Sequence, residues 1–285
     1  MQSKLKVLIS YHKPYKLLKD STFMPIHVGR DLADAKTKDG KSNKRKKNWL
    51  NKYLIGDNTG ENISKKNREY CELTAQYWVW KNYDKLETPD YIGFMHYRRH
   101  FEFINPYEKF LKSGEKTRKS LMEKLLFNTD VIVPEKFFCN KYTNYSYYFM
   151  SEKFNHQKDI DLTINIVKQL YPEYVTALNA YMSSRYAYFL NMFIMKKEMF
   201  FDYSNWLFSI LEELEKQIDM SDYDIEERRV IGRIAEILFG IYITKHKDNI
   251  KIKHLPLVYI PDSFSFDIVK IKQLIRKLKP FYFRS

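Results

Sequence analysis

Residues 91–101 read YIGFMHYRRHF, an apolar run that ends abruptly in a block of cationic and aromatic side chains. The apolar part has the length of a strand, and Gly93 keeps its backbone narrow. In open α/β sheets, ligands bind at the carboxyl ends of the strands. The arginines and histidines suit a polyanion, because guanidinium groups pair bidentately with phosphate oxygens. The segment therefore predicts a phosphate site at a strand end; the alternative is that these side chains only cap neighbouring carbonyls.

Strand-like and helix-like segments alternate along the rest of the chain. Strands are predicted at residues 5–10, 25–29, 91–95, 131–133, 191–195 and 255–260, and helices at residues 68–82, 107–127, 157–170, 200–218 and 226–244. The lysine-rich residues 36–52 and the tyrosine-rich residues 140–150 are predicted to be loops. This alternation favours an α/β fold with a mainly parallel sheet in one domain, residues 1–262, followed by a basic tail, residues 263–285.

The net charge of the chain narrows the classes of molecule that it is expected to bind. A net charge of +14 over 285 residues suggests nucleic acid, anionic lipid or a phosphorylated substrate. We expect no nucleic acid, because the charge is spread along the chain and no zinc-ligand spacing, helix-turn-helix or RNA-binding motif occurs. The chain's two cysteines, Cys71 and Cys139, lie far apart and predict neither a disulfide framework nor a metal site, which fits a reducing cytoplasm.

The two ends of the chain bear on its location. The first ten residues predict a strand instead of a signal peptide, and no window is apolar enough for a membrane-spanning helix. In the tail, Ile268, Ile271 and Ile275 fall on one helical face among many lysines and arginines. Such a helix suits an anionic membrane surface, and the alternative is a helix docked on the body. We expect a cytoplasmic protein, peripheral on the inner face of the cell membrane in the first case.

Several familiar motifs are absent, and five other segments carry a resemblance. The chain has no P-loop, no GxGxxG, no GxSxG and no HExxH. The segments are PIHVG (25–29), IGDNTGENIS (55–64), YCELTAQYWVWKN (70–82), DYIGFMHYRRHF (90–101) and NMFIM (191–195). With these, and most specifically with HYRR and ELTxxYWxW, the chain resembles a bacterial family of glycosyltransferases from capsular and exopolysaccharide clusters, formerly a domain of unknown function.

The resemblance spans about residues 5–260 and implies a fold and an activity. The fold would be GT-A-like, a Rossmann-type mainly parallel sheet flanked by helices. The activity would transfer a hexose, galactofuranose among them, from a UDP-sugar to a glycan or lipid-linked glycan acceptor. UDP-sugar is the donor substrate, and no cofactor is firmly implied. The alternative is a non-catalytic basic protein that binds nucleic acid or a membrane.

The resemblance also implies roles for individual residues. Those implied for donor binding are Tyr11, His12, Lys13, Asp57, Asn58, Asn62, Glu72, His96, Tyr97, Arg98 and Arg99. The last four would hold the diphosphate, since protonated side chains can neutralise a leaving group without a metal. Those implied for acceptor binding are His156, Asn191 and Met192.

The catalytic base stays open at this point. An inverting transfer needs a group that takes the proton of the acceptor hydroxyl. Glu226 and Glu236, in the helix predicted after NMFIM, and Asp161 are the candidates. Glu226 and Arg229 also have the spacing of an ordinary pair on a helix surface. Asp-x-Asp pairs at residues 159–161 and 222–224 do not follow apolar strands, so no metal ligand is assigned and metal dependence stays open.

Overall fold

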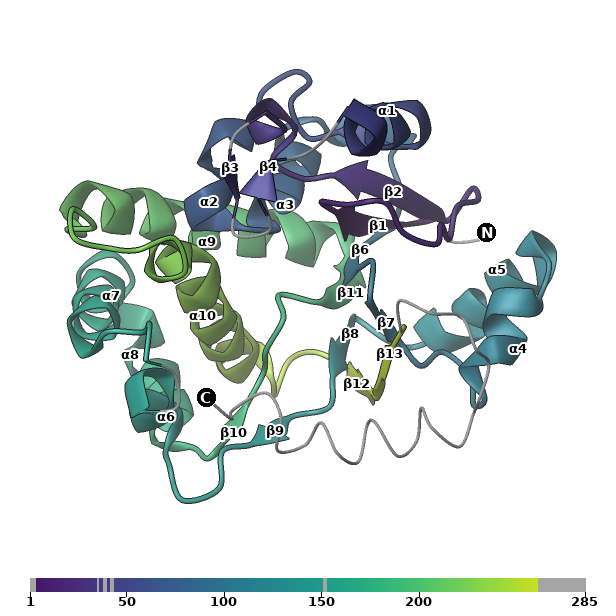
Figure 1. Ribbon diagram of the computed structural model, residues 1–285. Coiled ribbons are helices and arrows are strands. Elements are labelled where there is room, and N and C mark those ends of the chain that lie inside the picture. The colour runs from purple at the N-terminus through teal and green to yellow at the C-terminus, as the bar shows by residue number, and fades with distance from the viewer. Residues whose placement is uncertain (1–3, 35, 38–39, 42–43, 151–152, 261–285) are drawn as a thin grey trace.

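A nine-stranded sheet forms the centre of the molecule, and helices cover both of its faces (Figure 1). The structure is a computed structural model, which describes residues 4–34, 36–37, 40–41, 44–150 and 153–260. The main path of the sheet runs through β12 (Ile252–Leu255), β8 (Val131–Pro134), β11 (Phe193–Lys196), β6 (Tyr91–His96), β1 (Leu5–Tyr11), β2 (Phe23–His27) and β5 (Ile55–Gly56). The predicted α/β fold is thereby confirmed.

Strand direction brings distant segments to one edge of the sheet. β1 runs parallel to β2 and β6, β2 to β5, and β8 to β12. β11 is antiparallel to both of its neighbours, β6 and β8. Since Phe193 pairs with Phe94, the chain that enters β11 arrives at the edge where β1 and β6 end. This reversal places Asn191 beside the segment that begins at His96.

Shorter strands complete the β-structure. β7 (Arg99–Phe101) folds back on β6, where Arg99 pairs with His96, and also pairs with β13 (Leu257–Tyr259). The strand predicted at 255–260 corresponds mainly to β13, whereas its first residue, Leu255, is the last residue of β12 at the edge of the sheet. Two small ribbons lie apart from it: β3 (Lys36–Thr37) with β4 (Gly40–Lys41), and β9 (Phe137–Phe138) with β10 (Tyr186–Ala187).

The two faces of the sheet bury separate hydrophobic cores. On one face lie α2 (Asn67–Tyr70), α3 (Leu73–Lys81), α6 (Asn144–Met150), α7 (Gln157–Leu170), α8 (Val175–Ser183), α9 (Lys197–Gln217) and α10 (Val230–His246). On the other lie α1 (Lys44–Tyr53), α4 (Tyr107–Lys112) and α5 (Glu115–Leu126). The 3-10 turns are η1 (Arg30–Leu32), η2 (Ser64–Lys66), η3 (Tyr83–Leu86), η4 (Pro172–Tyr174) and η5 (Glu227–Arg229).

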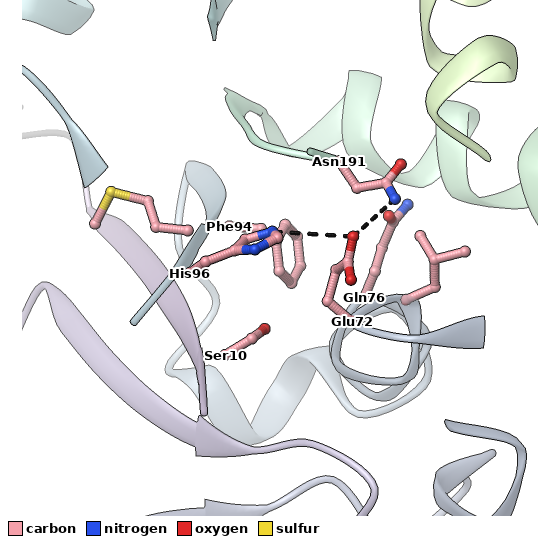
Figure 2. A pocket seen from close by; sticks show the side chains of 8 residues that line it. Ser10, Glu72, Gln76, Phe94, His96 and Asn191 are labelled. Atoms are coloured by element: carbon pink, nitrogen blue, oxygen red, sulfur yellow. Dashed lines mark hydrogen bonds and ion pairs between the residues drawn. The ribbon is translucent and has the colours of Figure 1, made fainter. Parts of the chain in front are cut away.

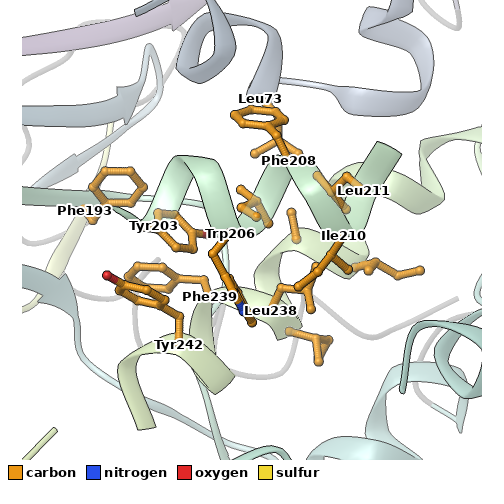
Figure 3. Packing of buried hydrophobic residues seen from close by; sticks show 14 of the residues in the cluster. Leu73, Phe193, Tyr203, Trp206, Phe208, Ile210, Leu211, Leu238, Phe239 and Tyr242 are labelled. Atoms are coloured by element: carbon orange, nitrogen blue, oxygen red, sulfur yellow. The ribbon is translucent and has the colours of Figure 1, made fainter. Parts of the chain in front are cut away.

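The core between α9 and α10 is rich in aromatic rings (Figure 3). The Tyr242 ring of α10 lies 4.8 Å from that of Tyr203 and 5.6 Å from that of Trp206, both on α9. Burying a large apolar side chain contributes roughly 1.5–3 kcal/mol. This packing fixes α10 against the sheet and so fixes the polar residues that α10 carries toward the sheet edge.

Four predictions of local structure need correction. The helix predicted at 68–82 breaks at Cys71, where φ is +51°. The helix predicted at 107–127 breaks between α4 and α5. Residues 44–52 of the predicted loop lie in α1, because lysine is a good helix former and Leu50 is buried against the body. Part of the predicted loop 140–150 forms α6, which the buried amide of Asn144 fastens to Tyr181 O at 2.8 Å.

In the described ranges, no helix is both long enough and apolar enough to cross a membrane. The tail, residues 263–285, lies outside the described residues, and so does its predicted helix.

Candidate functional site

A narrow pocket opens where β1 and β6 end, where β11 begins and where α3 starts (Figure 2). Its lining is Ser10, Glu72, Leu73, Gln76, Phe94, Met95, His96 and Asn191. Three of these, Glu72, His96 and Asn191, were predicted from segments far apart in the sequence. The structure therefore brings together predicted site residues from three separate motifs.

Hydrogen bonds tie the polar side chains of this pocket into one network. Asn191 Nδ2 donates to Glu72 Oε1 at 2.8 Å and to Gly232 O at 3.0 Å. His96 Nε2 lies 2.8 Å from Leu190 O and 3.9 Å from Glu72 Oε1. The carbonyl can only accept, so Nε2 carries a proton.

A second carboxyl group joins the network from behind the pocket. Leu190 N donates to Glu236 Oε1 of α10 at 2.9 Å. One dipeptide, Leu190–Asn191, thus contacts His96, Glu72 and Glu236. We call Glu72, His96, Asn191 and Glu236 the carboxylate cluster.

The backbone around the carboxylate cluster is unusual. Leu190 (φ +81°), Asn191 (φ +47°) and Cys71 (φ +51°) are all left-handed without being glycine. Such conformations cost about 1–3 kcal/mol each and concentrate at functional sites. A Cβ on Gly232 would lie 2.9 Å from Cys71 Sγ, so glycine lets α10 approach this bend closely. The bend in turn places Glu72 at the start of α3.

Burial and charge set the protonation of the cluster. Burial, and then the charge of Glu72, raises the pKa of Glu236 to about 8, against the opposing effects of Arg233 and Arg229. Burial lowers the pKa of His96, although Glu72 opposes this. His96 keeps some exposed surface, but the surrounding protein desolvates its ring. His96 is therefore neutral near pH 7, which corrects the expectation that it contributes a positive charge.

Cations gather beside the carboxylate cluster. Lys13 Nζ lies 6.0 Å and Arg98 Cζ 5.3 Å from the centre of the Tyr97 ring. Arg98 Nη1 also lies 3.4 Å from the hydroxyl of Tyr259, and Arg99 stands opposite His96 in the hairpin. We call Lys13, Arg98 and Arg99 the cation cluster. The buried Tyr97 ring gives this cluster a rigid base.

Three predicted residues are buried and support the site from within. The Tyr11 hydroxyl donates to Lys16 O at 2.9 Å inside the core. Met192 is fully buried in the hydrophobic core. Asp57 accepts hydrogen bonds from Gly29 N, Arg30 N, Ser64 Oγ and Thr74 Oγ1. Tyr11 and Met192 were predicted to contact the donor and the acceptor, but both side chains pack in the core instead. Asp57 holds the surrounding loops together through its hydrogen bonds.

Other predicted donor and acceptor residues are more accessible. His12 is exposed, and its ring meets Tyr97 edge-on with centres 5.1 Å apart. Asn58 Nδ2 donates to Asp31 Oδ1 at 2.8 Å, and Asn62 Nδ2 donates to Gly60 O at 2.8 Å. His156 Nε2 lies 3.1 Å from Glu227 Oε1. Of these four residues, His12 is exposed and the other three are half-buried.

The three predicted bases occupy different places. Glu236 belongs to the carboxylate cluster. Glu226 pairs with Arg229 at 3.2 Å, as an ordinary helix pair does. Asp161 lies on α7, which packs against α9, and accepts a 2.7 Å hydrogen bond from Tyr145. Figure 1 shows α10 between α7 and the sheet. Of the three predicted bases, Glu236 is therefore the one that lies in the carboxylate cluster.

Two arginines near the carboxylate cluster were not predicted as site residues from the sequence. Arg229 Nε lies 3.4 Å from Cys71 Sγ, and Arg233 Nη2 donates to Glu226 O at 2.6 Å. Arg229, Arg233 and Glu236 recur at intervals of four and three residues along an otherwise apolar helix. A polar stripe on a buried helix is the pattern that identifies them. Among the residues that the structure describes, no group of three or more His, Cys, Asp or Glu side chains is arranged to hold a metal ion.

Comparisons with known proteins place the chain in a family. Among solved structures, that of the bifunctional glycosyltransferase WbbM, in its apo form, is similar: it is 36% identical, with a TM-score of 0.76 over 93% of this chain and 48% of that one. The chain thus spans about half the length of WbbM, and the likeness confirms the GT-A-like fold class. None of the curated proteins matches. A family model described as a domain of unknown function, DUF4422, matches residues 6–247, so the chain belongs to the DUF4422 family.

Proposed function

We propose that this protein is a glycosyltransferase, which moves a hexose from a UDP-sugar to a glycan or lipid-linked glycan acceptor in capsular polysaccharide or exopolysaccharide synthesis. Galactofuranose is among the candidate sugars. The observation that carries the proposal is the juxtaposition of the carboxylate cluster with the cation cluster at one sheet edge. The likeness to part of a glycosyltransferase supports it.

The two clusters suit the two halves of a glycosyl transfer. The diphosphate of the donor binds to Lys13, Arg98 and Arg99, whose charges stabilise the negative charge that develops on the leaving group. We assign contacts with the rest of the donor to His12, Asn58 and Asn62. His156 and Asn191 are assigned to the acceptor side. A carboxylate takes the proton of the acceptor hydroxyl.

The proposal extends to location. We propose a cytoplasmic protein that contacts an anionic membrane surface through residues 263–285, on the strength of their sequence of lysines, arginines and spaced isoleucines. A lipid-linked acceptor would be reached at such a surface. The rival reading, a non-catalytic basic protein, predicts no sugar transfer and no effect of UDP on stability.

Transfer assays with Arg98→Ala test the proposal. The purified chain is incubated with UDP-galactofuranose, UDP-galactose and UDP-glucose, with octyl β-galactoside as acceptor, and released UDP is measured. We expect Arg98→Ala to lower transfer by about 10²–10³-fold, by analogy with loss of one donor to a developing charge. The exposed Arg45→Ala on α1 removes the same charge elsewhere and should leave the rate unchanged. Full activity of Arg98→Ala would contradict the diphosphate assignment.

A further inference from the structure

Glu72 and Glu236 belong to one cluster but differ in access to the pocket. Glu72 lines the pocket, whereas Glu236 stands behind Leu190 on α10. In Figure 2, Glu72 projects from the start of α3 between His96 and Asn191. A group that exchanges a proton with a bound hydroxyl must reach it within hydrogen-bond distance or through one water. By position, Glu72 is the carboxyl group that a ligand in this pocket meets.

The contacts of Glu72 leave part of its carboxylate available. Asn191 Nδ2 holds Oε1 at 2.8 Å. Within the described part of the chain, no hydrogen bond engages Oε2. Glu72 is also the residue that immediately precedes α3, where the partial positive charge of a helix N-terminus stabilises an anion. The arrangement fixes the carboxylate and presents one oxygen to the pocket.

Glu236 is held in a different state. Its Oε1 accepts the Leu190 N–H, and burial raises its pKa to about 8. The nearby charge of Glu72 adds to that rise, since two adjacent carboxyl groups do not readily ionise together. Near pH 7, Glu236 therefore holds a proton. A protonated carboxyl group cannot accept the proton of an acceptor.

We propose that Glu72 is the catalytic base of the transfer and that Asn191 is the positioning residue that orients its carboxylate. This assignment rests on the proposed glycosyltransferase function and changes the role that the resemblance implied for Glu72. The acceptor O–H bond breaks and its proton passes to Glu72 Oε2. The acceptor oxygen forms a bond to the anomeric carbon, and the bond from that carbon to the phosphate oxygen breaks. Its electron pair leaves with UDP toward the cation cluster.

The charged and titratable groups around Glu72 are consistent with this role. They are His96 of β6, Cys71 beside it in the chain, Arg229 of η5, and Glu236 of α10. Burial keeps His96 neutral, and burial also raises the pKa of the Cys71 thiol. The charge of Glu72 helps to raise the pKa of Arg229, so these two groups attract each other.

Paired glutamine variants test the assignment. With UDP-galactofuranose, UDP-galactose or UDP-glucose as donor and octyl β-galactoside as acceptor, Glu72→Gln should lower kcat by about 10²–10⁴-fold, the usual contribution of a general base. Glu236→Gln mimics the protonated carboxyl group and should lower kcat far less than Glu72→Gln does. Both should retain stabilisation of the fold by UDP. An active Glu72→Gln, or a Glu236→Gln variant as inactive as Glu72→Gln, would overturn the assignment.

A second measurement does not require turnover. Carbon-13 NMR of glutamate carboxyl groups, assigned with the two glutamine variants, should show Glu72 ionised and Glu236 protonated at pH 7 in the full chain. The reverse order would overturn the proposal even if transfer is never detected. Wild-type protein that neither transfers sugar nor is stabilised by UDP would instead contradict the proposed function, while the NMR result still decides which carboxyl group is ionised.

Discussion

Asn191 Nδ2 lies 2.8 Å from Glu72 Oε1, so the residue that leads into β11 holds the residue that leads into α3. The same amide also binds Gly232 O at 3.0 Å. One side chain thus links three elements that are remote in sequence. Both acceptors are oxygens, which requires the amide nitrogen to face them.

Replacing Asn191 by glycine should impair catalysis more than stability. Glycine adopts a φ of +47° readily, so the backbone stays in place while the amide is lost. We expect kcat to fall by about 10–100-fold, because a catalytic group misplaced by about 1 Å can lose that much. The KM for the donor should change little. Steady-state kinetics with separately varied donor and acceptor measure both quantities.

Leu190→Gly is the matched control for Asn191→Gly. It keeps the N–H that binds Glu236 and the C=O that binds His96, and it relieves a φ of +81°. Its kcat should remain close to that of the wild type. An equal loss of kcat in both variants would show that the bend, and not the Asn191 amide, matters.

Gly232→Ala should displace the bend at Cys71. In a helix interior, alanine is normally favoured over glycine by about 1 kcal/mol. Here the new Cβ would lie 2.9 Å from Cys71 Sγ and 3.0 Å from Cys71 Cβ, so the bend must shift. We expect a net loss of about 1–3 kcal/mol in the free energy of unfolding, measured in urea, and a lower kcat. Gly114→Ala, which meets no atom within 4 Å, should change neither by much.

Asp57→Asn should strongly destabilise the fold. The Asp57 carboxylate is fully buried and accepts four hydrogen bonds, from Gly29 N, Arg30 N, Ser64 Oγ and Thr74 Oγ1. The side-chain amide of asparagine would point its own N–H groups at some of these four donors, and hydrogen bonds would be lost. We expect a loss of about 3 kcal/mol or more in the free energy of unfolding, since each bond to a charged group contributes about 1.5–3 kcal/mol. The exposed Asp84→Asn should stay within about 0.5 kcal/mol of the wild type.

Glu236→Gln should change how stability depends on pH. The folded pKa of about 8 exceeds the ordinary value of 4.5, so the folded state holds a proton that the unfolded state releases between these values. The contribution of Glu236 is therefore complete below about pH 4.5 and is lost as pH rises through 8. Glutamine does not ionise, so the variant does not lose stability in this way as pH rises. The stability of the variant relative to wild type should rise by up to about 4 kcal/mol between pH 5 and 8.5.

Urea unfolding at pH 5, 6.5 and 8.5 measures this difference directly. A difference between Glu236→Gln and wild type that is constant across those pH values would show that Glu236 ionises normally in the folded protein.

The sequence predicts the framework well because its patterns are local. The helix predicted at 157–170 coincides with α7, and the strand at 91–95 differs from β6 by one residue. His96, which comes after the apolar run of a predicted strand, could be assigned to a sheet edge before any coordinates, whereas Asn191, at the start of a predicted strand, came from the resemblance. The resemblance supplied Glu72, although a lone glutamate in an aromatic helix carries no pattern of its own.

Other features depend on tertiary contacts that no local pattern reveals. The positive φ of Cys71 breaks one helix into α2 and α3, because Gly232 of α10 packs against it. Neighbours on other strands and loops bury Tyr11 and donate the hydrogen bonds that Asp57 accepts. The raised pKa of Glu236 depends on its burial and then on Glu72, which is far away in the sequence. Local patterns could therefore propose candidates for the base but could not rank them.

The most direct test of the account is a crystal structure of the protein with UDP bound. We predict that the diphosphate lies at the carboxyl ends of β1 and β6, with its oxygens within about 3.2 Å of nitrogen atoms of Lys13, Arg98 or Arg99. Glu72, which lines the pocket, would then face the position of the transferred sugar. UDP bound at any other part of the molecule, with its phosphates held by other residues, would contradict the account.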